Sequence, residues 1–258
     1  MKWIARFFVG CAFIAGCAGS LLLVPARLAA EDGTVATAVK PDEAQTHNNV
    51  ANSYGRAGRY QDAVKEYQEA IRLKPDFVEA YSNLGITYGT LKRYPDAIQA
   101  FERAVQLKPD FAQAHFNLGS VYYAAGRYQD AVKAFSDVVK LKPDDAEAHY
   151  QVGINYGNLG NFAEAAVAYE EAVRLKPQYP DASYNLCIAY SKLTRYPEAV
   201  QAFKQAIRLK PEFAQAHFNL GIAYLAQGDA GKALEEQQLL QNLDAALAGK
   251  LLGLINKK

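Results

Sequence analysis

The chain has 258 residues, half of them hydrophobic, which is ample for a core. Its 28 basic and 27 acidic residues give a formal net charge of +1. Positions 1–30 contain three basic residues and no acidic one, so the remainder of the chain has 28 − 3 = 25 basic and 27 acidic residues. Nucleic-acid affinity comes mainly from neutralising phosphates. This balance, with no basic patch or RNA-binding motif in sight, argues against a nucleic-acid partner.

Residues 1–30 are predicted to be a signal peptide or membrane anchor. Lys2 and Arg6 form a charged start, residues 7–26 carry no charge, and small residues around Ala30 suit a cleavage site. Two alternatives stay open: the uncharged run is retained as an anchor, or Ile14-Ala15-Gly16-Cys17, which resembles a bacterial lipoprotein box, leads to lipidation of Cys17. Against the lipoprotein alternative, the apolar run continues past Cys17. Each alternative predicts an exported protein, in the periplasm or membrane-anchored facing the periplasm or the outside.

Residues 31–43 are small, polar and unpatterned, and predict a flexible lead-in. From there one unit recurs at a fixed interval, for example 109 − 75 = 34, through six copies without an insertion. The recurring prolines are Pro41, Pro75, Pro109, Pro143, Pro177 and Pro211, and the recurring tyrosines are Tyr54, Tyr88, Tyr122, Tyr156, Tyr190 and Tyr224.

Each copy predicts two helices. In residues 77–108, apolar side chains recur at spacings of three and four in two runs, which is typical of one face of a helix. Pro95 suits the first turn of the second helix, and Pro109 stops it. Small residues share one position where the two helices must cross closely: Ala51, Gly85, Gly119, Gly153, Cys187 and Gly221.

The stretch NLGITYGTLKRYPDAIQAFERAVQLKP, residues 83–109, resembles the tetratricopeptide repeat almost throughout. The resemblance implies an all-α fold, a right-handed superhelical solenoid of stacked antiparallel helix pairs. It places six repeats in residues 44–244 and a C-terminal capping or tail helix in residues 245–258. The first and last copies depart from the pattern, for example at Gln237, where the others have an aromatic residue, as expected of end repeats with one neighbour.

No catalytic, metal or cofactor site is predicted, and the chain is not expected to be an enzyme. The four histidines share one position in four copies, too far apart to meet one metal ion, so they are predicted to pack in the core. Cys187, the only cysteine of the repeats, is predicted to be a small buried hydrophobe. A row of lysines leaves open a basic edge for an acidic partner: Lys74, Lys108, Lys142, Lys176 and Lys210.

The resemblance further implies that the first helix of each pair lines a concave groove that binds a protein or peptide partner. On that face lie a carboxamide ladder of Asn49, Asn83, Asn117, Gln151, Asn185 and Asn219, and the preceding residues Asn48, Ser82, Phe116, Tyr150, Tyr184 and Phe218. Three positions after the carboxamides come Asn52, Ile86, Ser120, Ile154, Ile188 and Ile222. The predicted binding residues are Asn83, Asn117, Asn185, Asn219, Phe116, Tyr150, Tyr184, Phe218, Ile154 and Ile188. Two alternatives stay open, in which the carboxamides bond within the fold and the rings pack between repeats.

Some family members grip a partner's terminal carboxylates with Lys and Arg on this face. Here Gln113, Asn117 and Asn48 stand at those positions and only Asn52 matches, so a chaperone-tail adaptor is not expected. The C-terminal segment keeps more apolar residues than one face needs, among them Leu240, Leu252 and Ile255, which predicts docking of a partner or a second copy.

The sequence therefore predicts a protein-interaction scaffold or adaptor of the cell envelope. Membrane association is expected through residues 7–26 only. Two alternatives stay open: a non-catalytic arm or accessory subunit of a transferase-type enzyme, and a self-assembling scaffold, with a homo-oligomer formed through the Leu-rich C-terminal helix.

Overall fold

The computed structural model describes residues 42–257, and this part of the chain is all α-helical, as predicted. The predictions for the leader, for Cys17 and for most of the lead-in lie outside these residues. No helix within residues 42–257 has the length and apolarity needed to cross a bilayer.

The chain divides into two compact units at the Arg93–Tyr94 bond. The described part of the first unit contains α2 (Glu43–Arg56), α3 (Tyr60–Leu73) and α4 (Val78–Thr90), and α3 packs on both of the others. The second unit contains α5 (Tyr94–Leu107), α6 (Ala112–Ala124), α7 (Tyr128–Leu141), α8 (Ala146–Asn158), α9 (Phe162–Leu175), α10 (Pro180–Lys192), α11 (Tyr196–Leu209), α12 (Ala214–Ala226), α13 (Ala230–Leu243) and α14 (Ala245–Ile255).

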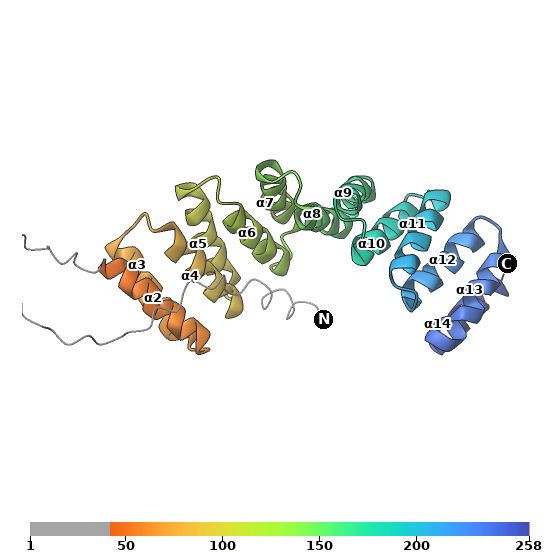
Figure 1. Ribbon diagram of the computed structural model, residues 1–258, viewed down its shortest axis with the longest axis horizontal. Coiled ribbons are helices and arrows are strands. Elements are labelled where there is room, and N and C mark those ends of the chain that lie inside the picture. Colours follow the sequence, from red (N-terminus) through yellow and green to blue (C-terminus); the bar gives the residue numbers. More distant parts are fainter. Residues whose placement is uncertain (1–41, 258) are drawn as a thin grey trace, which may run out of the picture. The chain divides into compact units, whose positions relative to one another are not determined.

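Within the second unit each helix packs on the next, and the helices alternate in direction along the row (Figure 1). Proline lies in the first turn of α10 and α11, where its missing N–H costs nothing. Tight turns join the two helices of a pair, and one residue in each has positive φ: Gly126, Gly160 and Gly228 in three turns, and Thr194 with φ 59° in the turn after α10.

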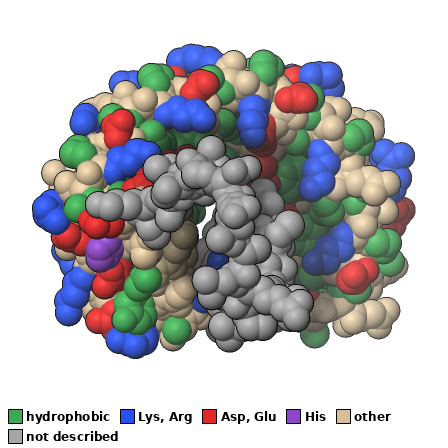
Figure 2. All heavy atoms as spheres, turned by 60° about the vertical axis from the view of Figure 1, so that its left-hand side comes forward, with side chains coloured by type: hydrophobic (Ala, Val, Ile, Leu, Met, Phe, Trp, Pro, Cys, Tyr) green, Lys and Arg blue, Asp and Glu red, His purple; other side chains and the backbone are tan. Residues whose placement is uncertain are grey.

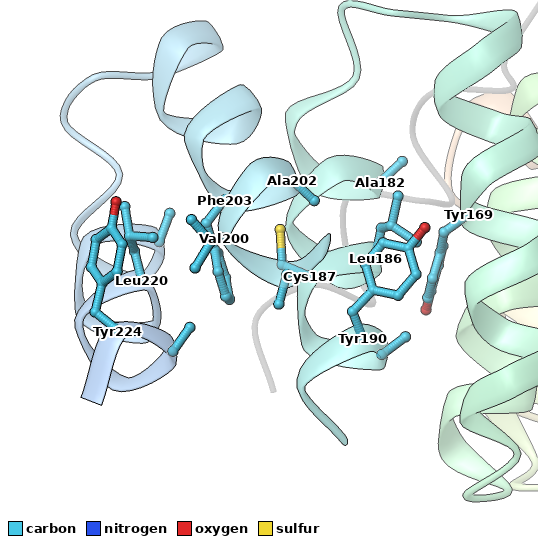
Figure 3. Close-up of a cluster of buried hydrophobic side chains, with 14 of the residues drawn as sticks. Tyr169, Ala182, Leu186, Cys187, Tyr190, Val200, Ala202, Phe203, Leu220 and Tyr224 are labelled. Carbon is cyan, nitrogen blue, oxygen red and sulfur yellow. The ribbon is translucent and has the colours of Figure 1, made fainter. Parts of the chain in front are cut away.

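The small residues of the helix crossing have the predicted role. A Cβ added to Gly119 would lie 2.9 Å from the Phe135 ring, and one added to Gly153 would lie 2.6 Å from the Tyr169 ring. Cys187 is fully buried, and Figure 3 shows its thiol in the cluster of apolar side chains that also holds Leu186 and Phe203. In the α6–α7 and α8–α9 pairs, the aromatic ring of the second helix therefore fills the space beside a small residue of the first helix.

In the last helix pair, α12 and α13, a leucine of α14 fills the space beside the small residue of the first helix. Gln237 of α13 stands where the other second helices have an aromatic ring, and α14 supplies the missing apolar group. A Cβ added to Gly221 would lie 2.5 Å from Cδ2 of Leu251, which is completely buried. Leu247 and Ala248 enter the core beside it. Other leucines of α13 and α14 stay exposed: Leu234, Leu239, Leu243, Leu252 and Leu254.

Candidate partner-binding face

The candidate site is the face of α6, α8, α10 and α12 that carries the predicted carboxamides, aromatic rings and isoleucines. We call it the first-helix face, and it belongs wholly to the second unit. The first unit carries Asn83 at the equivalent position of α4.

The carboxamides bond between neighbouring first helices. Asn185 donates from Nδ2 to the Tyr150 hydroxyl at 3.1 Å, and Asn219 donates to the Tyr184 hydroxyl at 2.9 Å. In the first unit Asn83 donates to Asn52 Oδ1 at 3.3 Å. Asn117 instead accepts a bond from Gln113 of its own helix. The Nδ2 groups of Asn185 and Asn219 thus bond within the fold. Their carboxamide oxygens accept no hydrogen bond from residues 42–257.

The aromatic residues are wedged between helices. Phe116 meets Phe135 edge-on with ring centroids 5.1 Å apart, and Tyr184 lies 4.8 Å from Phe213. Phe218 is half-buried against the core. Ring pairs at these distances stabilise packing beyond the area they bury. These aromatic side chains therefore stabilise the packing of the repeats. Only part of their surface is accessible to a partner.

Tyr150 is the most enclosed of the predicted rings. It is only 7% exposed and packs 4.8 Å from Tyr179 and 5.8 Å from Tyr169. Burial, followed by the charges of Asp181 and Glu147, raises the pKa of Tyr150 far above its usual range. Its hydroxyl therefore stays protonated and serves as the acceptor for Asn185.

The isoleucines form the apolar part of the face. Ile154, Ile188 and Ile222 occupy one position on α8, α10 and α12, and each is half-buried with its inner side against the core. Their outer sides remain accessible. The face therefore presents a row of aliphatic side chains next to the Asn185 and Asn219 carboxamides.

Sequence reasoning missed three residues of this face, namely Tyr123, Glu147 and Asp181. Tyr123 of α6 is 37% exposed, with its ring 5.7 Å from that of Tyr128. Glu147 accepts bonds from the Tyr179 hydroxyl at 2.6 Å and from Gln151 at 2.8 Å. The repeats did contain a signal, because Tyr123 stands where the other copies have Gly55, Gly89, Gly157, Ser191 and Leu225.

Charges on the second helices differ from those on the first-helix face. Several second-helix acids pair with a basic residue one turn away, as Asp130 does with Arg127 at 2.7 Å and Glu171 with Arg174. Among residues 42–257, neither Glu147 nor Asp181 has an ion pair. Figure 2 shows acidic and basic side chains interspersed over the surface that it displays.

Four of the five lysines of the row, all except Lys142, lie against aromatic rings. The ammonium groups of Lys108, Lys176 and Lys210 lie 5.6, 4.6 and 5.1 Å from the ring centroids of Phe111, Tyr179 and Phe213. These are distances at which a cation is attracted to a ring. The lysines thus pack on the rings that precede the first helices and stabilise these loops.

The described histidines and Cys187 have partners within the fold. His217 is buried, with Nδ1 2.6 Å from Glu236 and Nε2 2.9 Å from the Pro211 carbonyl. His115 and His149 bond the equivalent carbonyls of Pro109 and Pro143. Burial raises the pKa of the Cys187 thiol well above its usual range. Residues 42–257 contain no group of three residues that could hold a metal ion.

The fold is that of a repeat protein built from stacked helix pairs. The candidate face carries apolar side chains and carboxamides, which are groups that make contacts with other proteins. Tetratricopeptide repeat models match residues 50–110, 83–146, 116–180 and 159–202, and a further TPR repeat model matches residues 189–228. The chain therefore belongs to the tetratricopeptide repeat family.

Solved structures agree with the family. A structure described as the crystal structure of MamA protein has a TM-score of 0.63 and 26% identity, over 67% of this chain and 95% of that chain. A second MamA structure gives 0.60 and 28%, over 64% and 97%. YrrB, described as a TPR protein with an unusual peptide-binding site, gives 0.62 and 24%, over 69% and 91%, and so shows the fold alone. A search of the curated proteins finds no match.

Proposed function

We propose that this chain is a non-catalytic adaptor of the cell envelope that holds a peptide or helix of a partner protein on its first-helix face. The family and its solved relatives support a protein-interaction scaffold in general. The observation that carries the particular proposal is the row of Ile154, Ile188 and Ile222, half-buried at one position on three successive first helices and accessible on their outer sides.

Such a row suits a bound segment that runs across the repeats. Covering a further ~40 Å² of each isoleucine would contribute about 1 kcal/mol per residue, from the usual value for apolar area. The free carboxamide oxygens of Asn185 and Asn219 would accept backbone N–H groups of the segment. Apolar anchors would therefore supply affinity, and the amides would fix the direction of the chain.

Site-specific photo-crosslinking tests the proposal. A photoreactive amino acid replaces Ile188 in one variant of the full chain and Val167 in another. Val167 is the control because it is a branched apolar residue on α9, a second helix, and is 66% exposed. We expect a discrete crosslinked partner at position 188 that is absent at position 167 and disappears from an Ile154→Ser/Ile222→Ser background. Equal crosslinking at both positions, or none at 188, would contradict binding on this face.

The envelope location is a second part of the proposal and has its own test. It is supported by the charged start and uncharged run of residues 1–26. An alkaline phosphatase fused to the C-terminus is active only outside the cytoplasm. We expect phosphatase activity from the full-length fusion, and loss of activity when Lys2 and Arg6 are kept but residues 7–26 are deleted. An inactive full-length fusion would place the repeats in the cytoplasm.

Self-association is a second candidate function, favoured by the exposed leucines of α13 and α14. Leu239 is 51% exposed and Leu252 is 38% exposed, although both are large apolar residues. Several exposed apolar side chains on two helices that pack on each other are a candidate interface. Sedimentation should show a concentration-dependent dimer that Leu239→Ser/Leu252→Ser makes monomeric. A monomer at every concentration would remove this candidate and leave the first intact.

A further inference from the structure

The last helix, α14, has the place of a first helix. It packs on α13 at the end of the row, as α12 packs on α11 (Figure 1). Three buried positions of α12 recur as buried positions of α14, each 31 residues later, for example 251 − 220 = 31. The three pairs are Ala216 and Leu247, His217 and Ala248, and Leu220 and Leu251. The inner side of α14 is therefore packed like that of a first helix.

Leu252 of α14 has the position at which other first helices meet their second helix. It stands 252 − 221 = 31 residues after Gly221, and the equivalent residues Gly119 and Gly153 face the rings of α7 and α9. The glycines at this position and Cys187 are buried, whereas Leu252 is 38% exposed. Within residues 42–257, this side of α14 thus lacks the cover that a second helix gives the other first helices.

A position of α13 is also less covered than in the preceding copies. Leu234 is 39% exposed, whereas Val200, one copy earlier since 234 − 200 = 34, is 6% exposed. The equivalent residues Val132 and Ala166 are buried as well. In those copies the next helix pair continues the row. The end of the row therefore leaves apolar side chains accessible on both of its last helices.

The open side of α14 suits a helix better than a flat surface. A Cβ added to Gly249 or Gly253 would meet no atom within 4 Å, so a second helix has room to approach this backbone closely. Leu252 and Leu254 are both exposed, but two successive positions of this spacing lie about 200° apart around a helix. A membrane surface would therefore not cover both leucines at once, whereas a helix beside Leu252 leaves Leu254 aside.

The charge of α14 indicates the chemistry of its partner. Residues 245–258 contain Lys250, Lys257 and Lys258 and no acidic residue. Lys250 and Lys257 are exposed, lie seven residues apart on one side of the helix, and have no ion pair among residues 42–257. Acidic side chains would complement them. A second copy that placed its own α14 here would oppose lysine to lysine, because a two-fold interface joins the same patch to itself.

We propose that a helix of an acidic partner protein docks on the open side of α14, in the place that α7 and α9 take beside α6 and α8. Apolar side chains of that helix cover Leu252, and acidic side chains along one flank pair with Lys250 and Lys257. This site is separate from the first-helix face and does not rest on the proposed function. With both sites the chain would connect two proteins.

A helix-display selection on the full chain tests the assignment. Randomised helix-forming peptides, as long as the second helices α7, α9 and α11 with their 14 residues, are panned on three proteins. These are the parent, Lys250→Glu/Lys257→Glu, and the control Lys133→Glu/Lys142→Glu, which makes the same charge change at exposed lysines in and just after α7. We expect acidic residues seven positions apart to be enriched on the parent and the control, and not on the first variant.

The most enriched peptide is then synthesised with its two acidic residues and with lysines in their place. We expect the acidic peptide to bind the parent about tenfold more tightly than the lysine peptide, and the order to reverse on Lys250→Glu/Lys257→Glu. A reversal requires these side chains to meet the peptide directly, and a merely structural effect of the substitutions would not produce it.

The apolar contact has its own matched pair of variants. Binding of the acidic peptide should fall about tenfold in Leu252→Ser, because the leucine loses apolar area that the peptide covers. It should stay unchanged in Leu254→Ser, a similarly exposed leucine on the other side of α14. Circular dichroism of each variant confirms that the substituted proteins are folded.

Other results would overturn the proposal. No enrichment, peptides without the acidic pattern, or binding that Leu252→Ser leaves unchanged would show that α14 is not a site for an acidic helix. A parent dimer in sedimentation that Leu252→Ser makes monomeric would assign this side to a second copy, as in the second candidate function. Binding to phosphatidylglycerol vesicles that Leu252→Ser abolishes would assign it to a membrane. Crosslinking at Ile188 is measured independently, so each of these results leaves the first-helix face to its own test.

Discussion

At the scale of single residues, Asn155 is a polar group that the core does not satisfy. It is fully buried in α8 and donates from Nδ2 to the Gln151 carbonyl at 2.8 Å, but its Oδ1 has no partner within residues 42–257. Val121 occupies the equivalent position of α6 and is buried. Because an unsatisfied buried acceptor costs about 1–3 kcal/mol and the lost bond contributes about 1 kcal/mol, Asn155→Val should raise the free energy of unfolding by about 1 kcal/mol.

Urea denaturation measures this change. Asn158→Val is the control, since Asn158 makes the same bond to the carbonyl of Ile154 at 2.8 Å but is exposed. We expect no gain in the control. A loss of stability in Asn155→Val would mean that the Asn155 carboxamide makes a favourable interaction that outweighs the burial of its oxygen.

The glycines of α8 provide a matched pair with opposite expectations. A Cβ at position 153 would lie 2.6 Å from the Tyr169 ring, whereas one at position 157 would lie 3.7 Å from the Tyr169 hydroxyl. Gly153→Ala should therefore cost about 1–3 kcal/mol through overpacking. Gly157→Ala should gain up to about 1 kcal/mol from helix propensity. Thermal and urea unfolding of the two variants measure both changes, and equal effects would contradict the close crossing at Gly153.

At the scale of elements, the turn after α10 stores strain. Thr194 has φ 59°, a left-handed conformation that is unfavourable for a β-branched residue, and the equivalent residue after α8 is Gly160 with φ 80°. Relief of the steric cost, about 1–2 kcal/mol, exceeds the entropic cost of glycine, about 0.5–1 kcal/mol. Thr194→Gly should thus stabilise the protein by up to about 1 kcal/mol in urea denaturation, and Gly160→Ala should destabilise it. A destabilised Thr194→Gly would show that the threonine side chain has a role of its own.

The C-terminal helix closes the last pair with Leu251, beside which Leu247 and Ala248 are also buried. Leu251 fills the space above Gly221 that an aromatic ring fills in other copies, so Leu251→Ala should cost about 2–5 kcal/mol in the local free energy of opening. Because each repeat contacts only its neighbours, amide exchange should accelerate in α12, α13 and α14 and stay unchanged in α6 and α7. Leu254→Ala, at an exposed position of α14, should leave exchange unchanged. The same slow exchange in Leu251→Ala would show that α14 does not hold the end of the row.

The helices could be predicted from the sequence, but part of the candidate site could not. A fixed period with prolines between helix pairs determines which segments are helical, so the all-α repeat fold could be predicted. A C-terminal helix with an apolar stripe that includes Leu251 could be predicted, but the contact of Leu251 with Gly221 could not, because α14 follows α12 by 245 − 214 = 31 residues and so leaves the period. The bond of Asn185 to Tyr150 and the unpaired charge of Asp181 also depend on side-chain geometry across neighbouring repeats, which periodicity does not contain.

At the scale of the whole molecule, the outstanding question is the form in which the chain reaches its partner. We expect cleavage near Ala30, because Lys2 and Arg6 precede an uncharged run and small residues follow it. The intact mass of the protein recovered from an envelope fraction should then correspond to a chain that begins near Glu31. Ala30→Arg, which places a large charged residue at the predicted cleavage site, should shift the mass back towards that of the full chain.

The same measurement distinguishes the other two forms of the protein. A chain that keeps residue 1 would indicate a retained anchor, and the uncharged run of residues 7–26 would then be the element that holds the repeats at the membrane. A chain that begins at Cys17 with added acyl mass, lost in Cys17→Ser, would indicate a lipoprotein. In either of these cases the first-helix face would act at the membrane surface. A cleaved chain would instead diffuse freely to its partner. The intact mass, which identifies the first residue of the chain, therefore distinguishes binding at the membrane from binding away from it.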